Sequence, residues 1–331
     1  MMTRGYTAPE VRGVYNRAWE LCREMGETAQ LFPVLVGLSR FYYGRNSSRR
    51  ANELREQLLR LAHSGQDPSL LLVAHMNLGG NLFFQREFAQ AHIHAEQGIT
   101  LYDPLQHRTL IFLHGDDPEV TCRCWAALAL WYLGYPDQAL DKIYQALRIA
   151  QELAHPFGLA FALFWTAFLH QARGEVQRAQ EQTEALMTLT QEHGIPQFSA
   201  MGAIVHSWAL AEQGHEEEGI TQLQRGIAGL RAARQELGRP YFLSLLAETY
   251  RKRGQVEEGM NVLTEALAIT HNTGECMHQA ELYRVKGELL LKSQGVYEKM
   301  QTRKSVQNTL RTSRRRLRSW FPDLPPAAID P

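Results

Sequence analysis

Apolar side chains recur along this chain at the spacing of amphipathic α-helices. Leu128 and Trp131 fall on one face of a predicted helix, and Ile143, Ala146 and Leu147 fall on one face of the next. Apolar positions three and four residues apart are typical of helices, whereas strands alternate every second residue. The sequence has no long alternating runs and no Asn-Gly hairpin signal. We therefore predict an all-α fold.

The helical pattern repeats every 40 residues. Four segments that align by eye carry a glycine at the same place: Gly134, Gly174, Gly214 and Gly254. A small residue stands seven positions before and five positions after each glycine: Ala127, Ala167, Ser207, Ala247, Ala139, Ala179, Gly219 and Gly259. Glycine readily takes the left-handed conformation that ends a helix, and small residues let two helices approach closely. The period therefore predicts a stack of antiparallel helix pairs.

Two irregularities interrupt the period. The register continues backwards through Gly79 and Ser39, but Ala127 follows Gly79 by 48 residues, which predicts an eight-residue insertion within about 103–117. Pro240 follows Pro196 by 44 residues instead of 40. We interpret the four extra residues as about one additional turn on a helix over 216–235, since a turn takes about 3.6 residues. The following helix is then expected to be short.

We predict one helical array over residues 1–292, with roughly 14 helices. The first, over 9–25, is a second-type helix without a partner; six pairs follow, and a last first-type helix spans 277–291. Terminal repeats normally need polar caps, so the apolar faces expected at both ends suggest a fragment of something longer. Residues 293–331 form a basic, atypical C-terminal tail that we expect to be poorly ordered.

The small, aromatic and glycine positions resemble the tetratricopeptide repeat (TPR) in a lengthened, 40-residue form. That resemblance implies a right-handed superhelical solenoid of helix pairs. Longer phrases, among them LFPVLVGLSRFY, GITLYDPLQHR and AELYRVKGELLL, are similar to the C-terminal helical region of bacterial proteins that join a class III adenylate/guanylate cyclase domain to a STAND-type ATPase. This resemblance covers about residues 5–292. The catalytic residues of that family lie upstream of such a region, so the resemblance implies a sensing or docking array.

Composition narrows the class of protein. The 331 residues include 35 Lys+Arg and 35 Asp+Glu, and 44% are hydrophobic, which excludes a disordered, collagen-like or highly basic chain. Four cysteines without disulfide or zinc spacing are typical of a reducing cytosol. The longest apolar stretch, 159–169, is too short for a membrane span of about 20 residues. We expect a cytoplasmic protein with no membrane partner.

Basic residues dominate the tail. Seven basic and two acidic residues follow position 302. Such a block could contact phosphates, but it has few nearby aromatic residues, Trp320 and Phe321, and no known motif for reading nucleic acid. Nucleic acid is therefore not an expected partner, and a solvated tail is the simpler interpretation. The abrupt change of composition suggests a truncated or frame-altered gene end.

The inserted loop carries the densest polar cluster. Its side chains are Asp103, His107, His114, Asp116 and Asp117. Imidazole and carboxylate groups suit several metal ions, but no fixed i,i+4 pairing or HExxH-like frame organises the cluster as a whole. We favour an ordinary solvated loop, with Asp117 as the N-cap of the helix that Pro118 begins. No metal ion or cofactor is expected.

Two closely spaced pairs of possible metal ligands have a structural interpretation. Cys122 and Cys124 are two residues apart, as are His92 and His94. Residues at that spacing point about 200° apart around a helix, which prevents joint binding of one ion. We expect the cysteines to be buried as small hydrophobic residues.

Potential acid–base groups do not converge on a catalytic set. The acidic runs 216–218 and 257–258 fall at the start of second helices, where they favour the positive helix end. His206 is expected to be a packed or rim histidine. Because no set of acid, base and nucleophile can be assembled, we predict that the chain is not an enzyme.

An aromatic face on consecutive first helices is the most informative feature. Its residues are Phe83, Phe84, Trp125, Trp131, Tyr132, Phe164, Trp165, Phe168 and Trp208. Towards the C-terminal end the same face becomes charged, with Glu248, Arg251, Lys252, Arg284 and Glu288. Aromatic residues dominate interface hot spots, so one interpretation is a concave groove with an aromatic floor. The other is ordinary core between repeat units, because Trp is mostly buried.

These observations predict a binding function. The expected role is a scaffold or sensor array that holds a protein segment, or its own upstream signalling domains, in the aromatic groove. One alternative is a fragment of a multidomain cyclase/ATPase protein with only a regulatory role. Another is a peptide or small-molecule sensor, as in helical arrays attached to transcriptional regulators.

Overall fold

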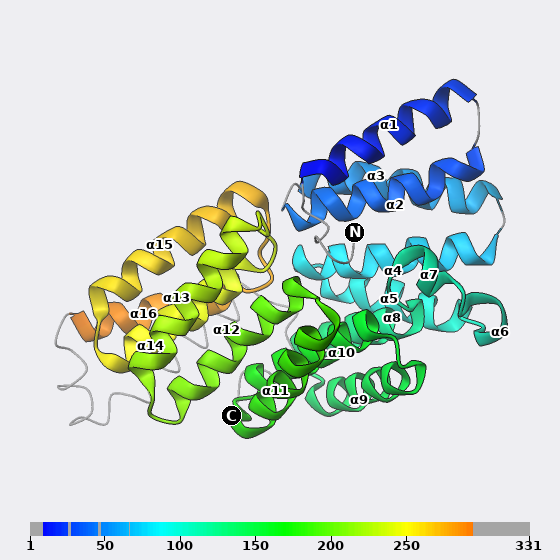
Figure 1. Cartoon of the computed structure of the whole chain (residues 1–331). Helices are drawn as coiled ribbons and strands as arrows, with labels where there is room; N and C mark the ends of the chain where they lie inside the picture. Colours follow the sequence, from blue (N-terminus) through cyan, green and yellow to red (C-terminus); the bar gives the residue numbers. More distant parts are fainter. Residues whose placement is uncertain (1–8, 26–27, 46–47, 66, 294–331) are drawn as a thin grey trace.

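The computed structural model describes residues 9–25, 28–45, 48–65 and 67–293, and all regular structure within them is helical. Figure 1 shows the helices stacked side by side in a curved array. Their bounds are α1 Pro9–Met25, α2 Thr28–Gly44, α3 Ser48–Gly65, α4 Pro68–Phe84, α5 Phe88–Leu101, α6 Pro104–His107, α7 Leu110–His114, α8 Pro118–Tyr132, α9 Pro136–Leu153, α10 Pro156–Ala172, α11 Val176–His193, α12 Pro196–Glu212, α13 Glu216–Ala232, α14 Arg239–Arg253, α15 Val256–Thr273 and α16 Gln279–Ser293. The all-α prediction is confirmed.

Helices pack in the pairs that the period predicts. The six pairs are α2/α3, α4/α5, α8/α9, α10/α11, α12/α13 and α14/α15. Helix α1 packs on α2 at one end, and α16 packs on α14 and α15 at the other. The 40-residue period therefore marks whole helical hairpins.

The turn glycines and small residues have the roles that the period assigns to them. Gly134 has φ of 87° and Gly174 of 72°, values in the left-handed region that other residues resist. Ala127 and Ala139 are completely buried. A Cβ atom added to Gly219 would lie 2.7 Å from the Cβ of Ala211, so the pair α12/α13 requires a glycine at this position.

The inserted segment differs from the expected solvated loop. It contains the short helices α6 and α7, and Leu105 within it is 96% exposed, but His107, Asp116 and Asp117 are buried. Asp117 is the N-cap of α8, as predicted, and its Oδ1 accepts from the amides of Glu119 and Val120 at 2.9 and 3.2 Å. Hydrogen bonds within the protein compensate part of this burial: Nδ1 of His107 accepts from the amide of Asp103 at 2.9 Å, whereas Nε2 of His107 has no partner. The side chain of His114 lies outside the described residues.

The predicted extra turn on the helix beginning at residue 216 is wrong. Helix α13 ends at Ala232, and the additional residues form a connection over 233–238 in which Arg234 has φ of 55°. The amides of Glu236 and Leu237 donate to the carbonyl of Gly44 in α2, at 3.0 and 3.2 Å. These tertiary hydrogen bonds compete with helix continuation, and sequence periodicity does not report them. Helix α14 has 15 residues and is short, as expected.

The array closes on itself through two such contacts. Besides the Gly44 contact, the amides of Cys276 and Met277 donate to the carbonyl of Phe84 at 3.1 and 3.2 Å. The connections before α14 and α16 thus reach the C-terminal ends of α2 and α4 (Figure 1). We call these two contacts the closure. It brings both halves of the array around a common interior.

Two expectations, a poorly ordered tail and the absence of a membrane span, depend on which residues the structure describes. Residues 294–331, nearly all of the predicted basic tail, lie outside the described residues. The expectation that the tail is poorly ordered therefore stays a prediction. Among the residues that are described, no helix combines the length and apolarity needed to cross a membrane.

Candidate functional site

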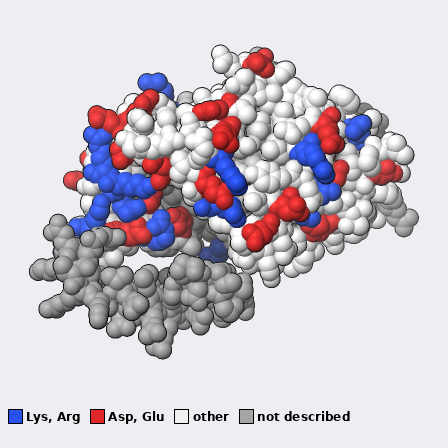
Figure 2. Space-filling view, turned by 90° about the horizontal axis from the view of Figure 1, so that it is seen from below, with Lys and Arg blue, Asp and Glu red and all other residues white. Residues whose placement is uncertain are grey.

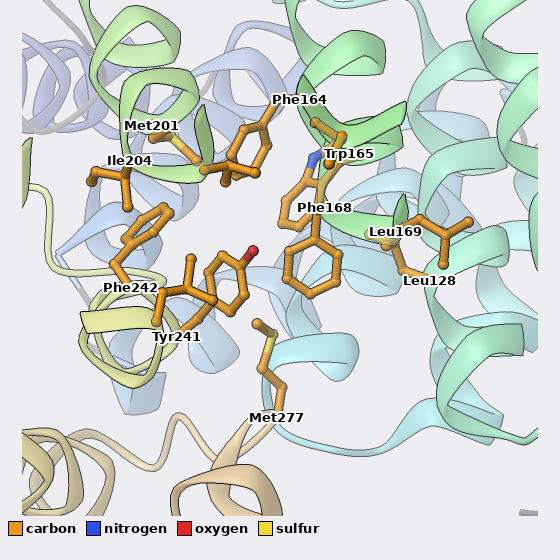
Figure 3. Packing of buried hydrophobic residues seen from close by; sticks show 14 of the residues in the cluster. Leu128, Phe164, Trp165, Phe168, Leu169, Met201, Ile204, Tyr241, Phe242 and Met277 are labelled. Carbon is orange, nitrogen blue, oxygen red and sulfur yellow. The ribbon is translucent and has the colours of Figure 1, made fainter. Parts of the chain in front are cut away.

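The inner surface of the array lines a central, partly open cavity of about 140 Å³. Its lining comes mainly from first helices α2, α4, α8, α10, α12 and α14, together with the connections that form the closure. Figure 3 shows Trp165 and Phe168 on one side of this interior and Tyr241, Phe242 and Met277 on the other. The cavity therefore lies between the two halves of the chain.

Five of the nine predicted groove residues line the cavity. They are Phe84, Trp125, Phe164, Trp165 and Phe168. Each is at most 6% exposed, so these rings face the interior and not open solvent. The sequence suggested either a binding groove or ordinary core between repeat units. Both interpretations apply here, because the same rings fill the space between units and form one wall of the cavity.

Trp165 is the centre of the aromatic wall. Its ring centroid lies 5.1 Å from Trp125, 4.9 Å from Phe164 and 5.3 Å from Phe168, all in edge-to-face geometry. Such pairs contribute about 0.5–1.5 kcal/mol beyond their buried area, which makes the wall rigid. The indole Nε1 of Trp165 is buried and has no hydrogen-bond acceptor.

The other four predicted residues lie away from the cavity lining. Phe83 and Trp208 are buried in the core, 0% and 4% exposed. Trp131 and Tyr132 are half-buried, and the hydroxyl of Tyr132 lies 3.4 Å from Nδ1 of His278. Phe83 packs behind the aromatic wall, with its ring centroid 5.9 Å from that of Trp125, and none of the four residues is part of the cavity lining.

Polar groups are few and concentrated at the N-terminal side of the cavity. Arg40 pairs with Asp116 through Nη1 and Oδ1 at 2.8 Å, and both side chains are at most 12% exposed. Burial raises the pKa of Asp116, while the charge of Arg40 opposes that shift. The Tyr43 hydroxyl donates to the carbonyl of Gly80 at 2.9 Å, and burial raises its pKa well above the ordinary value.

The charged C-terminal face forms ion pairs instead of an open binding surface. Arg251 pairs with Glu248 at 2.5 Å and with Glu288 at 3.1 Å, and Arg284 bridges Glu248 and Glu288 at 3.2 and 2.6 Å. Lys252 pairs with Glu212. Figure 2 shows acidic and basic side chains interspersed across this face. Their charges therefore largely neutralise one another.

The remaining candidate ligands are dispersed. Cys122 and Cys124 are completely buried, as predicted, and burial raises the pKa of both thiols. His94 instead stacks on His75, with the two Nδ1 atoms 2.9 Å apart, a contact between helices that the sequence spacing did not indicate. No group of three or more metal-ligating side chains occurs within the described part of the chain.

The two acidic runs and His206 follow the structural interpretation. The runs lie in the first turns of α13 and α15. His206 is half-buried, with Nε2 3.8 Å from Glu184. Neither feature reaches the cavity.

The sequence analysis did not predict the cavity wall that faces Trp165, nor the buried arginines. Tyr241, Phe242 and Met277 face Trp165 and Phe168 across the interior (Figure 3). The available signal was the 44-residue step before Pro240, which marks the connection that forms part of the closure.

Comparisons with known proteins show the fold. No protein-family model matches the chain. An uncharacterized protein of Rhizobium meliloti (strain 1021) is 24% identical over 293 residues, which are 87% of this chain but 28% of that protein's length. A Rap protein complexed with Competence and Sporulation Factor has a TM-score of 0.54 at 14% identity, covering 81% of this chain and 75% of its own. The apo form of RapI has a TM-score of 0.50 at 12% identity, covering 80% and 99%. The chain therefore has a TPR-like helical solenoid fold.

Proposed function

We propose that the array is a sensor module that binds a small, largely apolar molecule, or one apolar residue of a short peptide, in the central cavity. The supporting observation is the arrangement of aromatic side chains from α8, α10 and α14 around that cavity. Apolar lining with a few placed polar groups is typical of ligand sites. An apolar cavity of about 150 Å³ is large enough for benzene, which indicates the size of the group that this cavity accepts.

The closure gives the bound molecule a way to act on the rest of the protein. An occupant would contact the α10 wall and the α14 wall at once, because Trp165 and Tyr241 both line the cavity. A ligand that binds the closed state more tightly than an open state shifts the population towards the closed state. Occupancy would thereby hold the connections at Gly44 and Phe84 in place.

Acetophenone and cyclohexanone are suitable probes, since each has an apolar body and a carbonyl that can accept from Nε1 of Trp165. We expect saturable binding by titration calorimetry. Trp165→Ala should weaken it about 5- to 30-fold, which corresponds to about 1–2 kcal/mol. Trp208→Ala is the matched control, because Trp208 is also buried but does not line the cavity. Absence of saturable binding, or equal weakening by both substitutions, would contradict the proposal.

We also propose that the array works within a longer cytoplasmic signalling protein of the cyclase–ATPase type, through contacts with upstream domains. The observation that favours this context is the length of the Rhizobium meliloti relative, of which the chain spans 28%. The sequence phrases similar to that family add support. Sequencing the genomic region upstream of the Met1 codon tests the proposal. An in-frame cyclase or ATPase domain is expected, and an in-frame stop followed by an unrelated gene would contradict it.

A further inference from the structure

Arg55 of α3 is a buried guanidinium in the cavity lining. The residue is 2% exposed, and its Cζ lies 4.9 Å from the centroid of the Tyr43 ring. Nη1 donates to Oδ1 of Asn52 at 3.1 Å, whereas Nε is buried without a hydrogen-bond acceptor. The side chain has five N–H groups to satisfy, and the one on Nε is left without an acceptor.

Three other largely buried arginines of the described chain face carboxylates, whereas Arg45, whose Nε and Nη2 are buried without a hydrogen-bond partner, lies over the Phe41 ring. Arg40 pairs with Asp116, Arg123 with Glu119, and Arg239 with Glu236. Arg55 has no such ion pair, and its pKa is lowered to about 9 by burial, with the nearby Tyr43 hydroxyl opposing the shift. It is therefore still a cation at neutral pH. Buried charges are normally paired, so this cation stands out.

Neighbouring acceptors are already occupied. Oδ1 of Asn52 also accepts from Nε2 of Gln85 at 2.8 Å and from the Asn81 amide. The Glu275 carboxylate, which raises the pKa of Tyr43 from nearby, accepts from the amide of Gly238 at 3.0 Å. At this corner Arg55 offers hydrogen-bond donors to whatever enters the cavity, while the buried Glu275 carboxylate, which is not part of the lining, adds a negative charge nearby.

We propose that Arg55 binds the carboxylate of a small organic acid whose aromatic or short aliphatic body packs against the wall formed by Trp165 and Phe168. The inference rests on the proposed ligand-binding function and specifies the ligand class. Arginine suits this role because its planar donors match the two carboxylate oxygens. The apolar body must be small, because the cavity holds about 140 Å³.

Matched acid and amide probes test the charge requirement with the full chain. Benzoate, phenylacetate and butanoate would each be titrated beside the corresponding neutral amide, by calorimetry at pH 7. We expect at least one acid to bind about tenfold or more tightly than its amide, the range of a charge-assisted hydrogen bond. Arg55→Met should reduce that ratio to about one, and Arg55→Lys should retain part of it. Arg148→Met is the control, since Arg148 is exposed on α9.

Each outcome has a definite meaning. Because Arg55→Met replaces an unpaired buried charge by an apolar side chain, we expect it to fold, with unchanged circular dichroism and an unchanged or raised melting temperature. If acids and amides bind equally, or if Arg55→Met keeps the preference, the role of Arg55 is refuted while the cavity remains a ligand site. If no acid or amide binds and the neutral ketones also fail, the proposed function itself is refuted.

Discussion

The Arg40–Asp116 ion pair offers the sharpest test of how the cavity wall is stabilised. It joins α2 to the residue preceding the N-cap of α8, with contacts of 2.8 and 3.2 Å between the two guanidinium nitrogens and the two carboxylate oxygens. The side chains are 12% and 10% exposed. Removing one partner from a buried pair leaves an uncompensated charge and costs about 3–5 kcal/mol. We therefore expect Arg40→Met to lower the free energy of unfolding by about 3 kcal/mol at pH 7.

The pH dependence identifies the cause of that loss. In Arg40→Met the carboxyl of Asp116 keeps its burial, which raises its pKa, and loses the arginine that opposes the shift. A carboxyl whose folded-state pKa lies above its unfolded value binds protons more readily in the folded state. The variant should therefore recover stability relative to wild type as the pH falls from 7 towards 5.

Urea denaturation at pH 7 and pH 5, followed by circular dichroism and tryptophan fluorescence, measures both effects. Coincidence of the two signals checks that unfolding is one cooperative transition, which repeat arrays do not always show. Arg148→Met is the exposed control. A loss below about 1 kcal/mol, or an equal loss at both pH values, would refute the reasoning. The double variant Arg40→Met/Asp116→Leu should recover most of the loss, since an apolar pair can replace a buried ion pair.

Three further outcomes are expected. Burial lowers the pKa of His278 to about 4, below its unfolded value of about 6.5. The free energy of unfolding should therefore be highest above pH 6.5 and fall by up to about 3 kcal/mol towards pH 4. In urea titrations, His278→Gln should flatten this pH dependence. Gly219→Ala should destabilise by about 1–2 kcal/mol because its Cβ would clash with Ala211, whereas Gly229→Ala in the same helix meets no atom within 4 Å and should stabilise by up to about 1 kcal/mol. Gly134→Ala should lower the unfolding free energy by about 1 kcal/mol in the same assay, since φ there is 87°.

The sequence predicts the local architecture well because local rules determine it. The helix start at Pro118 and the glycine turns at Gly134 and Gly174 depend on residues close in sequence, and all three occur as expected. Small residues at a fixed period indicate which helices must approach closely. The order and pairing of the helices follow from these features alone.

Long-range features are different, because no local pattern encodes them. The connection over 233–238 is drawn away from helix by amides that donate to Gly44, almost two hundred positions earlier. The aromatic face was visible in the sequence, but whether Trp165 faces solvent or a cavity depends on how far the array curves. Arg55 gave no sequence signal, since a lone arginine in a helix is normally solvated.

The closure also has a consequence for the order of events during synthesis. Cys276 Sγ and the carbonyl of Gln85, which meet beside the closure, are 191 residues apart in the chain, so these groups meet only after almost the whole array has been made. Trp165 is translated 76 positions before Tyr241, the first residue of the opposite wall, and at about 5–20 residues per second the interval is roughly 4 to 15 seconds. For that time the aromatic wall has no opposite side, and the nascent chain presents it to water and to chaperones.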